Sequence, residues 1–358
     1  MRTRILIYGG TSLNPPQRRL VEAVVRRLLQ EHPDVVILSG GFWKWDPTTH
    51  PDRQDWVSVD QVVRETVLQV VGAAAAAQGL VSARLETWLG DRHLDRPDVL
   101  RYEDEAQYLG GSSDQARRFK LVAKADAILT VSGEGNTATV LELAMTIERP
   151  TLPIACTGGD SERFWDAHRE WFRGSLSPRG SSGLDETMLA RLSDPATLES
   201  DDSIAKLAVD IADTIYAAAL KRCLVLMPFD EGDTSYDEVI APAVRAAGYV
   251  PDRIDRLPTG GDIRDIFRDR LARSHHIVID VTGTNPNVMF ELGYVWATSD
   301  IKPLLILRHP LDEPAFDALP FYLKPLHIAN ADGGTPEGQQ ALARWITSFL
   351  GGEASEQR

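Results

Sequence analysis

Twice along this chain, a run of aliphatic residues is followed by a glycine-containing turn, a helical segment and a second aliphatic run. The first copy covers residues 124–154 and the second covers 274–307, and Glu142 and Glu291 occupy nearly the same place in the two copies. A strand, a crossover helix and a second strand form the unit of a parallel sheet with helices on both faces. The chain is therefore predicted to be an α/β protein with two Rossmann-like, doubly wound parallel-sheet domains. Two unrelated units of this kind would also look alike, and that alternative stays open.

The same alternation continues through the rest of the chain and predicts its main elements. In the first half, strands are expected at Arg4–Tyr8, Val35–Leu38, Leu80–Leu85, Ala127–Val131 and Thr151–Ile154, and helices at Pro16–Glu31, Val57–Gly72, Ser113–Lys124 and Thr137–Ile147. In the second half, strands are expected at Cys223–Met227, Ile277–Val281 and Leu304–Leu307, and helices at Tyr236–Ala247, Ile263–Arg273 and Asn287–Ser299.

A stretch rich in Ser, Pro, Gly and Asp between Gly174 and Asp202 marks a boundary between the two halves. A helix expected at Ile204–Leu220 either closes the first domain or bridges the two, and its assignment stays open. We therefore predict a first domain over residues 1–175, a linker with the bridging helix over 176–220, a second domain over 221–352 and a disordered tail over 353–358.

Composition narrows the classes of function. The 358 residues carry a formal net charge of -14, which disfavours a protein that mainly neutralises nucleic acid phosphates, although a local basic groove stays possible. The two cysteines, Cys156 and Cys223, lie far apart, so neither a disulfide framework nor a structural zinc site is expected, and no metal-binding residues are predicted. Apolar runs are too short to cross a membrane or to form a secretory signal, so a cytoplasmic protein is expected.

Three glycine-rich turns follow predicted strands of the first domain: Gly9-Gly10-Thr11-Ser12, Ser39-Gly40-Gly41 and the segment 132–137. At such turns, glycines allow close approach of a ligand, and free backbone N–H groups and hydroxyls favour phosphate. Arg117 and Arg118 could clamp the same anion. The residues predicted to bind a nucleotide are Gly9, Gly10, Thr11, Ser12, Gly40, Gly41, Arg117, Arg118, Gly133, Gly135, Thr137 and Glu142. A turn that serves the chain path alone is the alternative.

These residues resemble the SLOG superfamily, which includes LOG phosphoribohydrolases and the DNA-processing protein DprA. The likeness covers about the first half of the chain and rests on residues 7–12, 39–41 and 133–137 and the helix around Arg117 and Arg118. LOG-type enzymes carry acidic residues where this chain has Ala138 and Thr139. The resemblance therefore implies a member of the nucleotide-sensing branch, which is found beside effector domains in bacterial antiviral and stress systems.

The second domain carries polar groups at its predicted strand ends, and Glu291 is expected in the first turn of the following helix. Cleavage of an N-glycosidic bond passes through an oxocarbenium-like sugar, which a carboxylate stabilises while neighbouring groups orient the ribose. Glu291, Asp280, Asn285 and Asp269 are the predicted catalytic residues, and Met227, Pro228, Phe229, Thr282, Gly283 and Asn287 are the predicted substrate-binding residues. An ordinary helix carboxylate is the alternative for Glu291.

The block from Lys221 to Pro310 resembles the nucleoside 2-deoxyribosyltransferase-like superfamily, to which TIR-type NAD hydrolases are distantly related. The segment NPNVMFELGY at 285–294 carries the likeness, and it implies that Glu291 matches the family's catalytic glutamate. Asn285 stands where some transferases have an aspartate, and Asp269 loosely matches a helix aspartate.

Together, the two domains predict a nucleotide-regulated N-glycosidase acting on a nucleotide such as NAD or a nucleoside monophosphate, without a required cofactor and as a homo-oligomer. One alternative is a non-catalytic nucleotide sensor that signals to a partner. Another is a housekeeping deoxyribosyltransferase or nucleoside monophosphate hydrolase. Trp43, Trp45 and Trp56 flank a loop rich in Pro and Asp, for which packing is expected, or else a cover over the first crevice.

Overall fold

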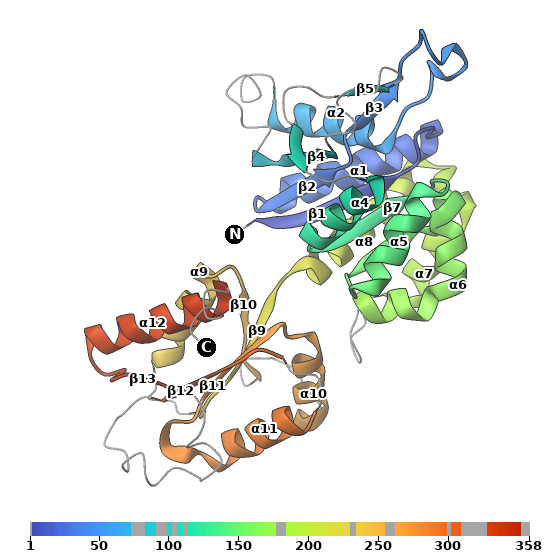
Figure 1. Ribbon diagram of the computed structural model, residues 1–358. Helices are drawn as coiled ribbons and strands as arrows, with labels where there is room; N and C mark the ends of the chain where they lie inside the picture. The colour runs from blue at the N-terminus through green and yellow to red at the C-terminus, as the bar shows by residue number, and fades with distance from the viewer. Residues whose placement is uncertain are drawn as a thin grey trace. The chain divides into compact units, whose positions relative to one another are not determined.

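The chain divides into two compact units, residues 2–220 and residues 221 onward (Figure 1). The computed structural model describes residues 2–72, 83–90, 99–101, 106–109, 113–176, 184–229, 234–254, 262–298, 302–308 and 328–351. Each unit contains a parallel sheet with helices on both faces, so the predicted α/β class with two Rossmann-like sheets is confirmed. The predicted tail at 353–358 and the core of the predicted linker, residues 177–183, lie outside the described residues.

The first unit is built on a six-stranded sheet in the order β6-β4-β2-β1-β7-β8. The strands of this sheet pair in parallel, and the order reverses at β1, which lies between β2 and β7. Its strands are β1 (Thr3–Gly9), β2 (Val35–Ser39), β4 (Leu85–Gly90), β6 (Ala106–Leu109), β7 (Ala127–Val131) and β8 (Thr151–Ile154). A separate antiparallel pair joins β3 (Phe42–Trp45) to β5 (Val99–Arg101).

Alternate side chains of these strands pack on opposite faces of the sheet, because successive strand residues point to opposite sides. Ile5 and Ile7 join one core with helices α1, α2, α6, α7 and α8, whereas Leu6 and Tyr8 join the other with α4 and α5. The helices are α1 (Pro15–Glu31), α2 (Val59–Val71), α4 (Asp114–Lys124), α5 (Asn136–Thr146), α6 (Gly159–Leu176), α7 (Glu186–Ser193) and α8 (Asp201–Ala219), with short turns η1 (Pro51–Arg53), η4 (Ala155–Thr157) and η5 (Pro195–Leu198).

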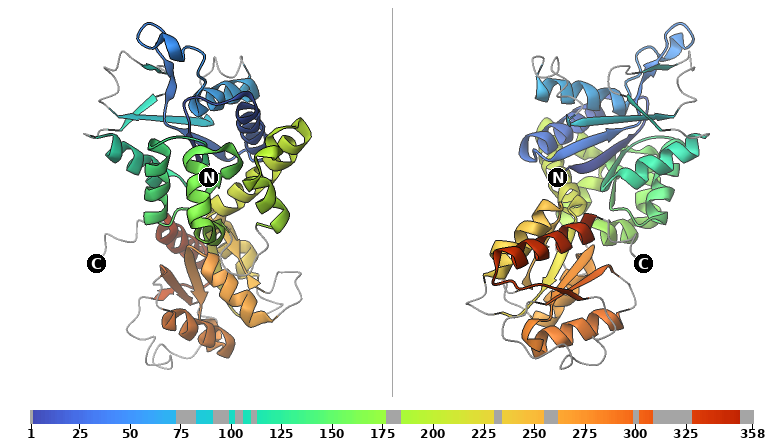
Figure 2. Two further views of the ribbon diagram at one scale, coloured as in Figure 1. Left: turned by 90° about the vertical axis from the view of Figure 1, so that its right-hand side faces the viewer. Right: turned by 60° about the vertical axis from the view of Figure 1, so that its left-hand side comes forward.

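The second unit is built on a five-stranded sheet in the order β10-β9-β11-β12-β13, whose pairings are all parallel. Figures 1 and 2 show α12 on one face of this sheet and α10 and α11 on the other. The elements are β9 (Arg222–Leu226), η6 (Tyr236–Ile240), α9 (Ala241–Ala246), β10 (Val250–Asp252), α10 (Ile263–Arg273), β11 (His276–Asp280), η8 (Thr282–Thr284), α11 (Pro286–Ala297), β12 (Leu304–Arg308), β13 (Ile328–Asn330) and α12 (Pro336–Gly351).

Most predicted elements appear within one or two residues of their expected bounds. The helix expected at Ile204–Leu220 begins three residues earlier, at Asp201, and two other elements differ more. Of the strand expected at Leu80–Leu85, residues 80–82 lie outside the described residues, and β4 begins at Leu85, where pairing with β2 starts opposite Ile37, and extends to Gly90. The helix expected at Tyr236–Ala247 is a π-helical turn followed by the short α9. Pro242, at the start of α9, has no N–H to continue an α-helical ladder.

The open assignment of the helix near Ile204–Leu220 concerns α8, and the structure places this helix in the first unit. Its residues Ile204, Leu207, Ile211 and Ile215 are buried in the core that α1 shares. Tyr216 stacks on His32 with ring centroids 3.5 Å apart, and its hydroxyl donates to Asp34 at 3.1 Å. Helix α8 therefore closes one face of the first sheet.

The two cysteines lie in different units, Cys156 in η4 and Cys223 in β9, and both are free and buried. Burial raises the pKa of each thiol to about 12. Among the described residues, no helix combines the length and apolar character needed to cross a membrane.

Candidate functional site

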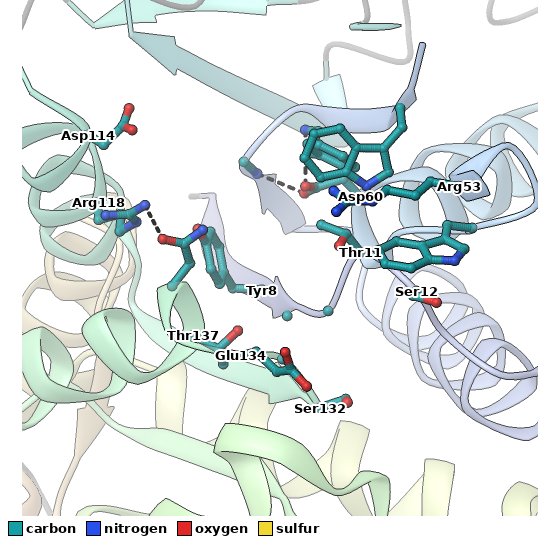
Figure 3. A pocket seen from close by; sticks show the side chains of 18 of the residues that line it. Tyr8, Thr11, Ser12, Arg53, Asp60, Asp114, Arg118, Ser132, Glu134 and Thr137 are labelled. Atoms are coloured by element: carbon teal, nitrogen blue, oxygen red, sulfur yellow. Dashed lines mark hydrogen bonds between the residues drawn. The ribbon is translucent and has the colours of Figure 1, made fainter. Parts of the chain in front are cut away.

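A cavity of about 650 Å³ opens at the carboxyl ends of β1 and β7 (Figure 3). This is the point where the strand order of the first sheet reverses, and ligands of doubly wound sheets bind at such points. The lining combines glycine turns, hydroxyls, charged groups and aromatic rings. It comprises Tyr8, Gly9, Gly10, Thr11, Ser12, Gly40, Phe42, Trp45, Arg53, Trp56, Asp60, Asp114, Arg117, Arg118, Ser132, Gly133, Glu134, Asn136 and Thr137.

Glycine is required where the turns after β1 and β7 approach one another. A Cβ on Gly9 would lie 2.0 Å from the carbonyl oxygen of Val131, and one on Gly133 would lie 2.0 Å from Oγ1 of Thr137. The N–H of Gly10 donates to Val131 at 3.0 Å, which holds the two turns together. Gly133 also has a φ of +94°, a conformation that side chains rarely adopt.

Several backbone N–H groups of these turns are available to a ligand. Within the described part of the chain, those of Thr11, Ser12, Gly133 and Glu134 make no hydrogen bond. The N–H of Ser132, in contrast, is held by Oγ1 of Thr157 at 2.7 Å. One backbone N–H at the start of α5 also has a partner, since the buried carboxylate of Asp160 accepts from the N–H of Ala138 at 2.9 Å. The turns therefore present a cluster of donors, as an anion site does.

Arg117 and Arg118 project from α4 into the cavity although both are more than nine-tenths buried. Nη1 of Arg117 donates to the carbonyl oxygen of Gly40 at 2.9 Å, and Nη2 of Arg118 donates to Oδ1 of Asn136 (Figure 3). Neither guanidinium lies within ion-pair distance of a described carboxylate, and the Nε atom of each is buried without a hydrogen-bond partner. Burial of a cation is costly. The carboxylate of Asp60 lies near enough to interact with the charge of Arg117, and an anionic ligand would offset more of this cost.

Asp60 supports the turn after β2 from the first turn of α2. Its carboxylate accepts from the hydroxyl of Ser39 at 2.5 Å and from the N–H groups of Gly40 at 2.9 Å and Phe42 at 3.1 Å. Burial raises the pKa of Asp60, opposed by these donors and by the charge of Arg117. Sequence reasoning missed this residue, because an aspartate at the second position of a helix usually serves the helix itself.

Aromatic side chains form another part of the lining. Trp45 and Trp56 face the cavity, and the guanidinium of Arg53 lies over both rings, 4.7 Å and 5.0 Å from their centroids. For Trp43, Trp45 and Trp56 the sequence favoured packing over a cover for the crevice. Trp45 and Trp56 line the cavity, and Trp43 does not. The signal in the sequence for this aromatic part of the lining was the spacing of the tryptophans along the loop.

Three residues predicted to bind the nucleotide do not line the cavity: Gly41, Gly135 and Glu142. Gly41 has a φ of +74° and packs against Thr87 and Leu89. Gly135 precedes α5 with a φ of +67°, and Glu142 is exposed further along that helix. The other nine predicted residues are brought together.

In the second unit, the strand order reverses between β9 and β11. Their pairing ends at Leu226 opposite Ile279, so Met227 and Asp280 follow side by side at the carboxyl edge. Met227 is buried, whereas Phe229 is half exposed. The segments after β9, β10 and β12, residues 230–233, 255–261 and 309–327, lie outside the described residues.

Glu291 lies on α11, in the second turn and not in the first as expected. Asn285 caps this helix and Pro286 begins it, which places the glutamate one turn further along. Glu291 is half-buried and has no hydrogen-bond or ion-pair partner in the described part of the chain. Burial raises its pKa to about 7. A carboxylate with a strongly raised pKa, on the helix that follows a strand end, is a candidate for chemistry.

Two of the other predicted catalytic residues, Asp280 and Asn285, hold local structure. Oδ1 of the buried Asp280 accepts from the N–H of Thr282 at 2.9 Å and from its hydroxyl at 2.5 Å. Oδ1 of Asn285 accepts from the N–H of Asn287 at 2.9 Å. Asp269 lies on α10, and its side chain is outside the described residues. Gly283 has a φ of +68° in the turn between these residues.

Two buried arginines at the same edge were not predicted. Arg253 follows β10, donates to the carbonyl oxygen of Pro228 at 3.3 Å, and lies over the rings of Tyr236 and Phe229. Arg308 ends β12 and is 4% exposed. An arginine that ends an aliphatic strand was the signal available in the sequence. Among the described residues, no group of three or more His, Cys, Asp and Glu side chains is arranged to hold a metal ion.

Comparison with known proteins adds distant likenesses. No family model and no curated protein matches the chain. The molybdenum cofactor binding protein of Rippkaea orientalis is 14% identical, with a TM-score of 0.28 over 42% of this chain and 75% of that one. The molybdenum cofactor carrier protein of Chlamydomonas reinhardtii is 13% identical, with a TM-score of 0.30 over 47% and 86%. S. aureus MnaA in complex with UDP is 14% identical, with a TM-score of 0.24 over 86% and 74%. Scores this low carry no functional argument.

Proposed function

We propose that the first unit binds a nucleotide through its phosphate. The observation that carries the proposal is the pair of buried guanidiniums, Arg117 and Arg118, beside the free N–H groups of the turns after β1 and β7. Fixed donors and cations around one cavity favour a phosphate, and the cavity volume lies within the range of about 300 to 1,000 Å³ typical of small-ligand sites. The carboxylate of Glu134 at the same cavity could accept from sugar hydroxyls.

Titration calorimetry of the full chain with AMP tests this proposal. Arg118→Gln removes one charge from the cavity and is expected to weaken AMP binding about tenfold or more, since a charge-assisted hydrogen bond contributes about 1.5 to 3 kcal/mol. Lys120→Gln, on the same helix but not in the cavity lining, is the matched control and should bind like the wild type. Equal affinity of Arg118→Gln and the wild type would contradict the proposal.

We also propose that the second unit hydrolyses the N-glycosidic bond of a nucleotide, such as NAD or a nucleoside monophosphate. The unpaired, half-buried carboxylate of Glu291 supports this proposal, together with the sequence resemblance around it. In the reaction the C1′–N bond breaks, the ionised Glu291 stabilises the sugar cation or bonds to C1′, and a water oxygen then takes its place. The base leaves with the bonding electron pair and the attacking water loses a proton. The base of a nucleoside monophosphate takes up a proton as it leaves, whereas the nicotinamide of NAD leaves as a neutral molecule, so with NAD the proton is released to solvent.

Release of free base, followed by chromatography, tests this second proposal. The panel contains NAD, NADP and the common ribo- and deoxyribonucleoside monophosphates. Glu291→Gln keeps the side-chain shape but cannot ionise, and is expected to abolish release. Glu337→Gln, an exposed carboxylate on α12, is the control and should keep full activity. Release that persists unchanged in Glu291→Gln would exclude the assigned role.

The two proposals together describe a regulated N-glycosidase in the cytoplasm, without a required cofactor, which assembles as a homo-oligomer and acts in bacterial antiviral or stress defence. Regulation requires that the first unit's ligand prefer the active arrangement. Base release that rises when the first unit's ligand is added supports it. Binding without any base release favours the non-catalytic sensor, and release that no nucleotide alters favours a housekeeping deoxyribosyltransferase or nucleoside monophosphate hydrolase.

A further inference from the structure

The lining of the first-unit cavity is divided by chemistry. The glycine turns and the arginines of α4 supply its polar part, whereas the segment from β3 to Trp56 supplies Phe42, Trp45, Arg53 and Trp56. Figure 3 shows Arg53 with Thr11 and Ser12 on one side of the cavity and Arg118 on the opposite side. A ligand that fills the cavity therefore meets Arg118 on one side, and on the other side the aromatic rings together with Arg53 and the turn at Thr11 and Ser12.

The first turn of α2, which supports the turn after β2, also holds the start of the aromatic segment from β3 to Trp56. The hydroxyl of Ser58, the N-cap of α2, lies 2.7 Å from the carbonyl oxygen of Phe42 and 2.8 Å from that of Trp43. The carboxylate of Asp60 accepts from the N–H of Phe42 at 3.1 Å. One structural unit thus fixes Gly40 and the aromatic segment relative to each other.

Arg53 keeps the two indole rings apart. Its guanidinium carbon lies within 5.0 Å of the centroids of Trp45 and Trp56, as in a cation–π stack. Trp45 also meets Phe42 and His50 edge to face, with centroids 5.2 Å and 4.6 Å away. The wall formed by Trp45, Arg53 and Trp56 is consequently a fixed stack of planar groups that borders the cavity.

We infer that this wall binds the base of the nucleotide by stacking, while the phosphate lies at the glycine turns and the arginines of α4. The inference rests on the proposed nucleotide binding of the first unit and specifies the ligand: a purine nucleotide, whose two fused rings offer more area to an indole than a pyrimidine does. Stacking on an aromatic side chain strengthens binding about 5- to 150-fold per base.

AMP and ribose 5-phosphate test the wall because they differ only by the base. Calorimetry on the full chain should show that AMP binds about 5- to 150-fold more tightly. Trp45→Leu should bring AMP close to ribose 5-phosphate and leave ribose 5-phosphate itself unchanged. Trp45→Phe should keep most of the difference, since Nε1 of Trp45 has no hydrogen-bond partner to lose. Trp43→Leu is the control on the same strand and should alter neither ligand.

Different results would overturn the nucleotide site of the first unit and the base-binding wall. Equal affinity of AMP and ribose 5-phosphate for the wild type, with both weakened by Arg118→Gln, would overturn the base-binding wall and leave the phosphate site standing. An equal loss of both ligands in Trp45→Leu and Trp45→Phe would also overturn it, because the wall would then support the cavity without contacting the base. Binding of neither ligand would overturn the nucleotide site and the wall together.

Discussion

At neutral pH the side chain of Glu291 is divided between its acidic and ionised forms, because burial raises its pKa to about 7. A group whose folded-state pKa is raised stabilises the fold below its unfolded pKa, and this stabilisation is lost as the pH rises through the folded value. Glu291→Gln should therefore raise the free energy of unfolding at pH 8 by about 1 to 2 kcal/mol, after allowance for partial exposure. Urea unfolding at pH 8 and at pH 5.5 measures the gain, which should shrink at the lower pH. A destabilised variant at pH 8 would show that the carboxylate supports the fold.

The same titration predicts how base release depends on pH. If the ionised form of Glu291 stabilises the sugar cation, the rate should rise with pH and level off above about 7. Initial rates of base release between pH 5 and pH 9 measure this profile. A rate that falls through the same range would instead assign Glu291 the part of a general acid.

Site residues whose type and position after a strand already indicate their role could be predicted from the sequence. Glycines and hydroxyls directly after an aliphatic strand identified the turns at Gly9 and Gly133, and these turns meet in the cavity. Asp60 could not be predicted in the same way, because its role depends on contacts between a turn and a helix that only the folded chain brings together. For Trp45 the sequence offered a cover over the crevice only as the alternative to packing, because the path of its loop is set by the fold.

At the scale of elements, the turn between β7 and α5 contains two glycines that are needed for different reasons. Gly133 has both a positive φ and no room for a Cβ, whereas Gly135 has a positive φ and nothing within 4 Å of the added atom. Gly133→Ala is expected to cost about 2 to 4 kcal/mol of stability and to abolish AMP binding. Gly135→Ala should cost about 1 kcal/mol. Thermal unfolding with AMP titration measures both, and similar losses would contradict this reading of the turn.

The start of α2 supports a second prediction at this scale. The N–H of Gly40 donates to Oδ1 of Asp60 and that of Phe42 donates to Oδ2. Asp60→Asn replaces one of these two oxygens with an amide nitrogen that cannot accept, so one of the two N–H groups loses its acceptor. We expect a loss of about 2 to 3 kcal/mol of stability and weaker AMP binding, because a buried donor is left unsatisfied. Asp55→Asn, in the exposed loop before the helix, is the control and should leave both unchanged.

Strands β7 and β8 were predicted with their observed bounds because each is a mostly aliphatic run without a charged residue. Strands β3, β10 and β13 are also short, and each contains a charged or amide residue, Lys44, Asp252 or Asn330, so no apolar run marks them in the sequence. Helices α6 and α12 were missed although both are long. The packing that selects them involves residues far apart in the chain.

At the scale of the whole molecule, each unit has its own hydrophobic core, so each should fold by itself. A fragment of residues 1–220 is expected to unfold cooperatively and to bind AMP. A fragment of residues 1–200 lacks α8, and should lose both properties because the buried face of α1 becomes exposed. Circular dichroism melts and AMP titration compare the two fragments. A stable 1–200 fragment would show that α8 is dispensable.

The burial of both native cysteines allows selective dye labelling, with which the distance between the two units can be measured. Each unit holds one native thiol, and a pKa of about 12 leaves about three thousandfold less thiolate than an exposed cysteine has at neutral pH. Maleimide dyes would therefore react with a cysteine introduced on the surface and spare Cys156 and Cys223. A donor and an acceptor dye could be attached, one to each unit, without first removing native residues. Energy transfer between them would then report whether a nucleotide changes the distance between the units.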